Sequence, residues 1–359
     1  MSDSDSLFLL AAIEMAERGR FTCAPNPTVG CVIVRDGKIV GRGFHERTGE
    51  AHAEVNAIAD AGHHVAGATV YVSLEPCAFA GRTPACAKTL VEAEVARVVI
   101  AAEDPHPRVA GAGIEILRAA GVEVTLRVLP EALELIGGYV SRITRSRPLV
   151  RVKTASSIDG AIALESGESQ WITSPQARQD VQYWRARSDA IITGIGTVLA
   201  DDPRLSVREP GYLPCQQPLR VVLDSHLRIP PQAALLNDGG PTLLVHDPDT
   251  APPEHLSVTD NVSCLSMEGG TANLQGLLNH LAGLGCNEVL VEAGAKLCGS
   301  FAEQQLWDEW LCYIAPKWLG DDSRKLAEFR VQSLAAAPRG SIKSVLRIGD
   351  DLRICLERE

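Results

Sequence analysis

Apolar residues in the first part of the chain alternate between helical spacing and short continuous runs, with polar residues and glycines between them. The 3.6-residue spacing predicts helices over Leu7–Arg18, Ala53–Ala61, Ala87–Glu94 and Gly113–Ala120. The continuous runs predict strands over Gly30–Val34, Lys38–Gly43, Ala68–Leu74, Ala96–Ala101 and Val122–Leu126. The first two strands are joined by an Asp36-Gly37 turn. Alternation of this kind predicts a three-layer α/β domain.

The second part alternates in a similar way. Its pattern predicts a helix over Pro175–Arg187 and strands over Leu149–Thr154, Ala190–Thr193, Leu219–Leu223, Thr242–His246 and Glu288–Glu292. Consecutive apolar residues such as Val289-Leu290-Val291 are typical of buried strands in a mixed or parallel sheet. Three arginines interrupt the apolar pattern between Ser141 and Pro148, which we take as the linker. We therefore expect two domains, residues 1–146 and 147–359.

Composition narrows the possible partners. A chain of 359 residues is long enough for two domains, and 45% hydrophobic with 22% charged residues is ordinary globular composition. The net charge of -11 and an aromatic content of 4% argue against a nucleic-acid partner or an acidic membrane surface. A locally basic site can still hold one phosphate group.

The location follows from the N-terminus and the cysteines. Leu7–Ile13 is a short apolar stretch followed by Glu14 and Glu17, without the basic segment of a signal peptide or the length of a membrane span. The ten cysteines then read as reduced thiols. We expect a cytoplasmic protein.

The clearest chemical signal is His52-Ala53-Glu54, followed by Pro76-Cys77 and then Cys86. One imidazole and two thiolates form a three-ligand zinc set that leaves the fourth position open for water, and a glutamate two residues after the histidine is the proton shuttle of zinc-dependent deaminases. The pattern places His52 and Glu54 at one helix N-terminus and Cys86 just before another. We therefore predict one catalytic Zn²⁺ per chain.

A structural zinc is the alternative for the same residues. Such sites are usually closed by a fourth cysteine or histidine, and no fourth ligand is evident nearby in the sequence. His63-His64 is close in sequence but lies in the connection after a helix, where we expect it to be exposed to solvent.

Longer motifs give a resemblance to a known family. Pro25-Asn26-Pro27-Thr28-Val29-Gly30, the His-Ala-Glu run and the Gly81-Arg82-Thr83-Pro84 segment between the two cysteines resemble the deaminase half of the bifunctional riboflavin-biosynthesis deaminase/reductase family. Phe79 and His106 depart from that family, where we expect histidine and asparagine. Segments around Lys153, Ser169, Gly194, Asp201 and Val291 resemble its reductase half, so the likeness covers nearly the whole chain.

The resemblance implies a cytidine-deaminase-like three-layer α/β/α domain followed by a dihydrofolate-reductase-like α/β domain. The first would hydrolytically deaminate 2,5-diamino-6-(5-phosphoribosylamino)pyrimidin-4(3H)-one, with Glu54 as its acid/base. The second would use NADPH to reduce the ribosyl group of 5-amino-6-(5-phosphoribosylamino)uracil to ribityl. The residues implied to read the small-molecule substrate in the deaminase are Asn26, His45, Glu75 and Arg82.

The resemblance also assigns the reductase residues. Those implied to contact NADPH are Ala155, Trp171, Thr197, Asp201, Ser225 and the turn formed by Gly294, Ala295, Lys296, Leu297, Cys298, Gly299 and Ser300. Those implied to hold the substrate are Lys153, Ser169, Arg185, Leu205, Arg208 and Glu292. Arg185 and Arg208 suit a bidentate phosphate clamp, although without the resemblance each would more readily be interpreted as a solvated surface arginine. Lys153 either positions the ribose or only flanks its strand, and Asp201 either orients a group or belongs to a structural Asp-Asp-Pro turn.

Three other functions stay open at this stage. A deaminase of another base with a non-catalytic C-terminal domain would release ammonia without consuming NADPH. A nucleic-acid-editing deaminase would show salt-dependent nucleic-acid binding, and a zinc-stabilised binding module would be indifferent to loss of Glu54. The sequence leaves open whether the chain forms a homo-oligomer, whether the intermediate is channelled, which face receives the hydride and how the two rates compare.

Overall fold

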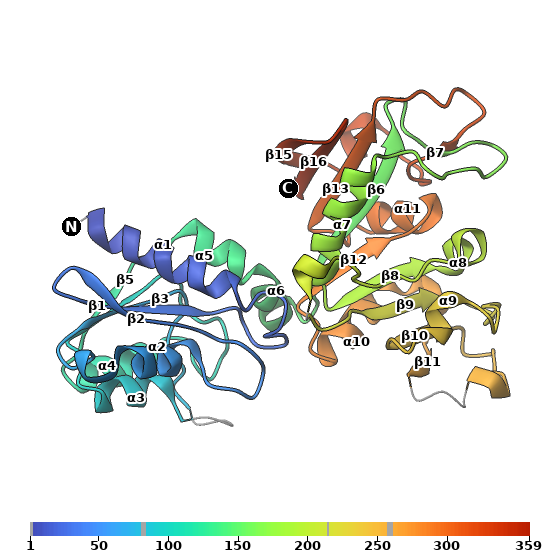
Figure 1. Ribbon diagram of the computed structural model, residues 1–359. Helices are drawn as coiled ribbons and strands as arrows, with labels where there is room; N and C mark the ends of the chain where they lie inside the picture. Colours follow the sequence, from blue (N-terminus) through green and yellow to red (C-terminus); the bar gives the residue numbers. More distant parts are fainter. Residues whose placement is uncertain (1–2, 80–83, 214, 257–260) are drawn as a thin grey trace. The chain divides into compact units, whose positions relative to one another are not determined.

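The computed structural model describes residues 3–79, 84–213, 215–256 and 261–359. The chain forms two compact units, Met1–Ser146 (unit 1) and Arg147–Glu359 (unit 2), and each has a large sheet of its own (Figure 1). Within the described residues, none of the helices combines the length and the apolar character that crossing a bilayer requires.

Unit 1 is built on a five-stranded sheet with the order β2-β1-β3-β4-β5. Its strands are β1 (Gly30–Arg35), β2 (Lys38–Phe44), β3 (Thr69–Val72), β4 (Arg97–Ile100) and β5 (Glu123–Leu126). Its helices are α1 (Asp3–Glu17), α2 (Ala53–Ala61), α3 (Cys86–Glu92), α4 (Ala112–Ala119), α5 (Pro130–Leu135) and α6 (Gly137–Arg145), with a 3₁₀ turn at Gly62–His64. β1 pairs antiparallel with β2 and β3, whereas β3, β4 and β5 are parallel.

Both faces of this sheet are covered by helices, as the alternation of side chains along β1 requires. Cys31 and Ile33 face the cluster formed with α2, α3 and α4, whereas Val32 and Val34 face α1 and α5 (Figure 1). The expected three-layer α/β/α arrangement is confirmed.

Two glycines of β2 allow α2 to lie directly on the sheet. A Cβ atom at Gly41 would stand 2.4 Å from the Ala57 carbonyl oxygen, and one at Gly43 would stand 2.2 Å from the Ala53 carbonyl oxygen. Any side chain at these positions would push the helix away from the strand. The glycines therefore fix the place of the helix N-terminus, where His52 and Glu54 are found.

The last helix of unit 1 occupies most of the segment that we expected to be a linker. α6 runs to Arg145, so the expected linker is helical for most of its length. Tyr139 Oη donates to Asp104 Oδ1 at 3.1 Å, and Arg142 Nη2 donates to the Pro25 carbonyl oxygen at 3.0 Å. The arginine pattern that suggested an exposed connection belongs instead to a helix bound to two loops of unit 1.

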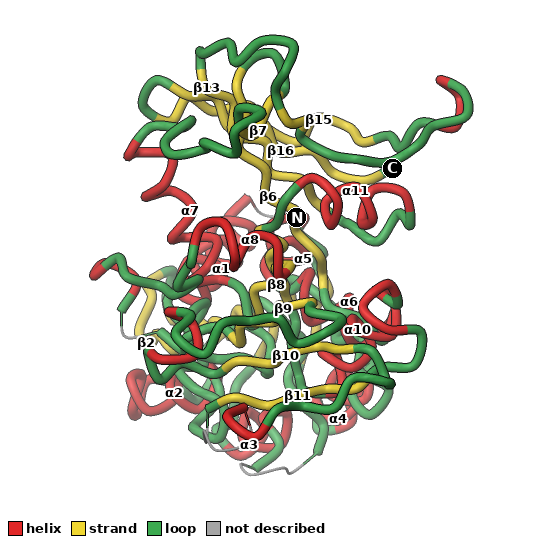
Figure 2. The backbone as a smooth tube through the Cα atoms, turned by 90° about the vertical axis from the view of Figure 1, so that its right-hand side faces the viewer, coloured by secondary structure: helices red, strands yellow, loops and turns green. Residues whose placement is uncertain are grey.

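Unit 2 is built on a nine-stranded sheet with the order β11-β10-β9-β8-β12-β6-β13-β16-β15. Figure 2 shows β8, β9, β10 and β11 following one another at one side of this sheet. Its strands are β6 (Leu149–Ser157), β8 (Ala190–Gly194), β9 (Leu219–Leu223), β10 (Thr242–His246), β11 (Val262–Ser266), β12 (Glu288–Glu292), β13 (Glu309–Ala315), β15 (Gly340–Ile348) and β16 (Asp351–Arg358). β7 (Ala161–Ala163) and β14 (Arg324–Lys325) form a separate pair. Its helices are α7 (Pro175–Arg187), α8 (Ile195–Asp201), α9 (Ala234–Asn237), α10 (Leu274–Gly283) and α11 (Ala295–Glu303). Its 3₁₀ turns are Pro210–Tyr212, Glu254–Leu256, Gly270–Ala272 and Leu334–Ala336.

All strands from β11 to β13 in this sheet run parallel, and the hairpin β15–β16 adds an antiparallel edge. The middle strands are buried on both faces, which explains their uninterrupted apolar runs. In a parallel sheet, the carboxyl ends of neighbouring strands meet at one edge, and ligands bind there. β6, β12 and β8 are neighbours, so this edge is where the expected reductase residues belong.

A buried network of charges lies near the amino-terminal ends of β6, β12 and β13. Arg151 forms ion pairs with Glu288 and Glu309, and Arg187 forms a second pair with Glu288 with 2.7 Å between Nε and Oε2. Burial raises the pKa of Glu288, but Arg151 and Arg187 outweigh this and lower the pKa to about 2.

Glu288 should therefore make unit 2 sensitive to acid. Its pKa is 4.5 in a model peptide and about 2 when folded, so its stabilisation is complete above pH 4.5 and is lost as the pH falls to 2. We expect about 3 kcal/mol to disappear over this range. All five tryptophans lie in unit 2, so denaturant titrations followed by tryptophan fluorescence at several pH values measure the loss. Glu288→Gln should show a smaller loss over the same range, and equal losses would contradict the assignment.

Candidate functional site

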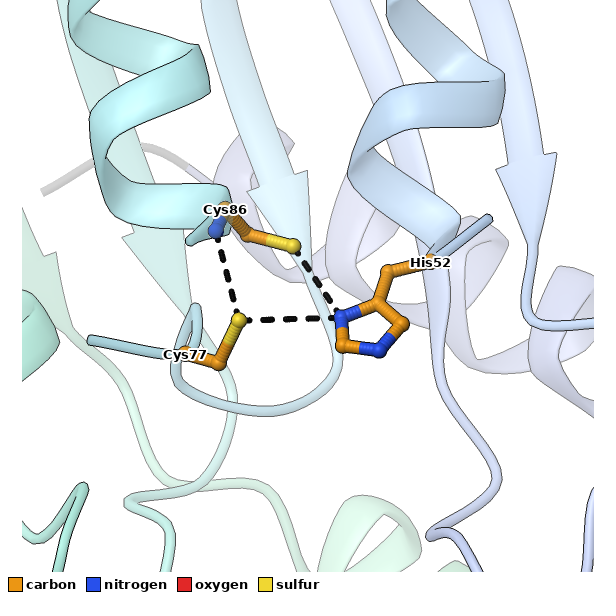
Figure 3. Close-up of side chains that lie close together, drawn as sticks. All are labelled: His52, Cys77 and Cys86. Atoms are coloured by element: carbon orange, nitrogen blue, oxygen red, sulfur yellow. Dashed lines mark hydrogen bonds between the residues drawn. The ribbon is translucent and has the colours of Figure 1, made fainter. Parts of the chain in front are cut away.

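The three expected zinc ligands converge in unit 1 (Figure 3). His52 immediately precedes α2, Cys77 lies in the segment after β3, and Cys86 is the first residue of α3. His52 Nδ1 is 3.2 Å from Cys86 Sγ and 3.6 Å from Cys77 Sγ. Ligand atoms bound to one tetrahedral zinc stand roughly 3.5 Å apart, given the usual bond lengths. The donor set therefore fits Zn²⁺ and leaves one coordination position open.

The surroundings favour a thiolate at Cys77. The backbone N–H of Cys86, at the start of α3, donates to Cys77 Sγ at 3.2 Å. The hydrogen bond from the Cys86 thiol lowers the pKa of Cys77 to about 4, with burial opposing and His52 assisting. Zinc binds the deprotonated sulfur, so the protein environment prepares this ligand for the metal.

Glu54 lies in the first turn of α2 and is 3% exposed. Burial, followed by the negative charge of Cys77, raises the pKa of its carboxyl group to about 7. A carboxyl group with a pKa close to neutral can both accept and return a proton, as an acid/base catalyst must. The exposed position expected for His63 and His64 is confirmed, since both lie in the exposed 3₁₀ turn after α2.

Asn26 and His45 form a connected pair beside the ligands. The His45 Nδ1–H donates to the Ala51 carbonyl oxygen at 3.1 Å, so its Nε2 accepts from Asn26 Nδ2 at 2.9 Å. The His45 ring makes an edge contact with the His52 ring, with 5.3 Å between centroids. Burial lowers the pKa of His45, which favours the neutral ring. The structure thus brings both expected substrate residues to the metal ligands.

Glu75 has a different place from the one expected. It is 3% exposed, and its two carboxylate oxygens accept from four backbone N–H groups. These donors are Asp104, Gly111, Gly113 and Ile114. Gly113 and Ile114 are in the first turn of α4, whose N–H groups have no helical partner. Glu75 therefore caps α4 and fixes the preceding loop, and its oxygens are not available to read a substrate.

Replacing Glu75 by glutamine should destabilise unit 1. A glutamine amide keeps one uncharged acceptor oxygen, so two of the four backbone donors lose their acceptor altogether, at a cost of about 2 kcal/mol or more. We expect earlier loss of the circular dichroism signal and of bound zinc on denaturation, while the tryptophan fluorescence of unit 2 is unchanged. If deamination slowed in Glu75→Gln without any change in unfolding, Glu75 would be a substrate residue after all.

Arg82 lies outside the described residues. Phe79 and His106, the two departures from the family, lie near each other with 6.2 Å between ring centroids. Sequence reasoning missed Arg108, whose guanidinium group stacks on Phe79, because no spacing rule links the two positions.

Two of the substrate residues expected in unit 2 lie on adjacent strands, Lys153 in the middle of β6 and Glu292 at the end of β12. Lys153 and Glu292 are paired neighbours on these two strands. Arg185, from α7, donates to both Glu292 oxygens, at 2.5 Å from Nε and 2.9 Å from Nη2. Burial lowers the pKa of Lys153, opposed by the charge of Glu292. A lysine of lowered pKa suits proton donation.

This geometry corrects the expected phosphate clamp. Arg185 is 12% exposed and bidentate to Glu292, so it positions that carboxylate and does not offer a free fork to phosphate. Arg208 is exposed, and its side-chain contact is a long 3.4 Å bond to Ser206 Oγ. Of the two arginines, Arg208 is the one available to an anion.

Leu205 and Ser169 differ in what they can offer. The Leu205 side chain is 3% exposed and packs into the core with Ala177 and Val181, so a substrate contact here comes from its main chain. Ser169 is half-buried in the segment before α7.

The expected cofactor residues in the segments that follow β8 and β12 lie together. A Cβ atom added to Gly294 would stand 3.9 Å from Thr197 Oγ1, and one added to Gly194 would stand 3.8 Å from a methyl carbon of Leu297. The expected Gly294–Ser300 turn is helical, because α11 begins at Ala295. The backbone N–H groups of Ala295, Lys296 and Leu297, in its first turn, precede the helical hydrogen bonds and face an incoming anion.

The rest of this segment serves the fold. Cys298 is fully buried and donates from Sγ to the Ala293 carbonyl oxygen, and its N–H bonds the Gly294 carbonyl oxygen. Gly299 packs against the backbone of Glu328, and Ser300 Oγ donates to the Lys296 carbonyl oxygen. The Cys298 thiol and the Ser300 hydroxyl thus each donate to the backbone of their own segment.

Four further cofactor positions were expected in unit 2. Ala155 is on β6, and Asp201 is exposed at the end of α8. Trp171 is 61% exposed, and the guanidinium group of Arg178 stacks on its ring at 4.2 Å. Ser225 follows β9 and shares a 2.6 Å hydrogen bond with the Thr271 hydroxyl, a neighbour that the sequence did not reveal.

Comparison with known families agrees with both sites. The family described as the cytidine and deoxycytidylate deaminase zinc-binding region matches residues 2–102. The family described as the RibD C-terminal domain matches residues 148–354. Fold and site together define a zinc-binding deaminase joined to a reductase that uses a nicotinamide cofactor.

Full-length relatives specify this further. The riboflavin biosynthesis protein RibD of Escherichia coli is 43% identical over 98% of both chains. A solved structure of Acinetobacter baumannii RibD has a TM-score of 0.92 at 40% identity, covering 99% of both chains. The diaminohydroxyphosphoribosylaminopyrimidine deaminase/5-amino-6-(5-phosphoribosylamino)uracil reductase of Thermotoga maritima has a TM-score of 0.88 at 30% identity and the same coverage. The chain belongs to the RibD family of bifunctional deaminase/reductases of riboflavin biosynthesis. The expected fold and bifunctional activity are confirmed, and a single-activity deaminase is not favoured.

Proposed function

We propose that unit 1 deaminates 2,5-diamino-6-(5-phosphoribosylamino)pyrimidin-4(3H)-one, with one Zn²⁺ held by His52, Cys77 and Cys86. The observation that carries this proposal is the convergence of these three donors beside the buried carboxyl group of Glu54. When bound, the metal supplies a water that ionises near neutral pH.

The residues of unit 1 then move protons and orient the ring. Glu54 accepts a proton at its carboxylate and returns it to the departing nitrogen, for which its pKa of about 7 is suited. Its burial keeps bulk water from competing for that proton. Asn26 retains a carbonyl oxygen and a second N–H for the pyrimidinone after its bond to His45.

We propose that unit 2 binds NADPH and reduces the ribosyl group of 5-amino-6-(5-phosphoribosylamino)uracil to ribityl. The cofactor supplies the hydride, and the protein orients it against the sugar. Lys153 donates a proton to the sugar oxygen. Glu292 orients Lys153 from the adjacent strand, and Arg185 in turn positions Glu292. Arg208 binds the substrate phosphate, and the first turn of α11 with Thr197 and Ser225 holds the cofactor.

We also propose a cytoplasmic location, since all ten cysteines are free thiols.

One experiment tests both halves. Ammonia release and NADPH oxidation are followed together on the diaminopyrimidinone substrate, before and after zinc is removed with a chelator. We expect both signals from the zinc-loaded protein. The chelated protein should lose both, yet should still oxidise NADPH when given the deaminated intermediate. Ammonia release without NADPH consumption in the loaded protein would contradict the reductase assignment.

A further inference from the structure

Three side chains from two loops meet close to the proposed zinc site. Phe79 lies two residues after Cys77, and the guanidinium carbon of Arg108 stands 3.8 Å from the centroid of its ring. The His106 ring approaches the same phenyl ring at 6.2 Å. None of these contacts is explained by the zinc ligands or by Glu54.

His106 fixes the backbone on which Arg108 stands. The His106 N–H donates to Asp104 Oδ1 at 2.8 Å, and the Arg108 N–H donates to His106 Nδ1 at 3.2 Å. Since Nδ1 accepts, the ring proton is on Nε2. His106 thus closes a short turn and sets the direction in which the Arg108 side chain leaves the loop.

The loop itself is anchored on both sides of this turn. Glu75 accepts from the N–H groups of Asp104 and Gly111, and Tyr139 donates to Asp104 Oδ1. Glu75 is two residues before Cys77, so the anchor ties the loop to the strand end that carries a zinc ligand. Arg108 is therefore held at a fixed place relative to the metal ligands.

The guanidinium group of Arg108 offers a positive charge and N–H donors to a ligand. Arg108 is exposed, and among the residues that the structure describes it has no ion pair with a carboxylate. Stacking on a phenyl ring uses the face of the guanidinium group and leaves the N–H groups at its edge free. Such an edge binds phosphate oxygens in a bidentate manner.

We propose that Arg108, held by Phe79 and His106, binds the phosphate of the deaminase substrate and makes unit 1 selective for the phosphorylated form. The inference rests on the deamination proposed above, since the base must reach the zinc site. The pyrimidinone and the ribose carry no charge, so the phosphate is the anion that the substrate offers to a guanidinium group. Phe79 and His106 act through Arg108 and are positioning residues.

The test compares kcat and KM for ammonia release on the phosphorylated substrate and on the same compound without its phosphate. Arg108→Gln should raise KM for the phosphorylated substrate about tenfold or more with little change in kcat, because a charged hydrogen-bonding partner is lost. KM for the dephosphorylated compound should not change. Arg118→Gln, which alters an exposed arginine of α4, serves as the matched control and should leave both constants unchanged. Zinc content and circular dichroism confirm folding.

Two positioning variants separate this role from a general one. Phe79→Leu should raise KM for the phosphorylated substrate, and adding it to Arg108→Gln should cause no further rise, since both act through one contact. His106→Asn keeps a side-chain acceptor for the Arg108 N–H and should raise KM less than His106→Leu does.

The possible outcomes distinguish the phosphate assignment, the role of Phe79 and the proposed deamination from one another. Equal effects of Arg108→Gln on both compounds, or no effect on either, would overturn the phosphate assignment while leaving deamination intact. Additive effects of Phe79→Leu and Arg108→Gln would overturn the positioning role of Phe79. A zinc-loaded wild-type protein that releases no ammonia from either compound would contradict the proposed function itself.

Discussion

Glu54→Gln is expected to reduce ammonia release by about 1,000-fold or more, within the range that loss of a positioned acid/base catalyst produces. Glutamine has the shape of glutamate but can neither accept nor return a proton. Since Glu54 is 3% exposed, no bulk water replaces its carboxylate. The measurement is single-turnover ammonia release at a saturating concentration of the diaminopyrimidinone.

Two controls make this result specific. Zinc content should remain at one ion per chain, because Glu54 is not a ligand, and NADPH oxidation on the deaminated intermediate should equal that of the wild type. A variant that retained a tenth of the wild-type rate would show that another group moves the proton. Loss of zinc in Glu54→Gln would instead indicate that Glu54 helps to hold the metal.

Arg185→Met is expected to abolish the reductase activity and to destabilise unit 2 by about 3 kcal/mol or more, because it leaves the buried carboxylate of Glu292 without its bidentate partner. Lys153 and Arg208 are then the cations whose charges act on Glu292, and we expect both to be drawn toward it. The measurements are NADPH oxidation on the deaminated intermediate and denaturant unfolding followed by tryptophan fluorescence.

The double variant Arg185→Met/Glu292→Gln separates the two effects. Removing both charges abolishes the unpaired buried carboxylate, so much of the lost stability should return. Reductase activity should stay absent, because Lys153 has lost the neighbouring negative charge of Glu292. If Arg185 instead bound the substrate phosphate directly, Arg185→Met alone would raise KM without a change in unfolding.

The zinc ligands and Glu54 could be predicted from sequence because each of them sits at the end of a locally recognisable element. His52 precedes a helix with clear periodicity, and Cys86 begins the next. The parallel strands of unit 2 were visible for a similar reason, since burial on both faces leaves continuous apolar runs. The residues after α11 show neither helical periodicity nor continuous apolar runs that we recognised, so β13, β15 and β16 were not predicted from the sequence.

The partners of Arg185 and Glu75 were not predictable in the same way. Arg185 and Glu292 are 107 positions apart, and nothing local to a charged helix indicates that one arginine turns inward to a strand end. Glu75 follows a strand, where a ligand contact is a reasonable expectation. Its four backbone donors come from the loop before α4 and from the first turn of α4, about 30 to 40 positions later. In both cases tertiary packing, which the local sequence does not reveal, determines that the side chain binds groups of the protein and not a ligand.

Helix α6 has a practical consequence for anyone who wishes to separate the two activities. Through Tyr139 and Arg142 it is bonded to the loop of Asp104 and to the carbonyl of Pro25, next to Asn26. A deaminase fragment cut at Ser141, where the sequence first suggests a junction, would lose the last turn of this helix together with Arg142. The chain should be cut after Ser146. We expect a fragment that ends there to fold independently and to keep the hydrogen bonds from α6 to both loops.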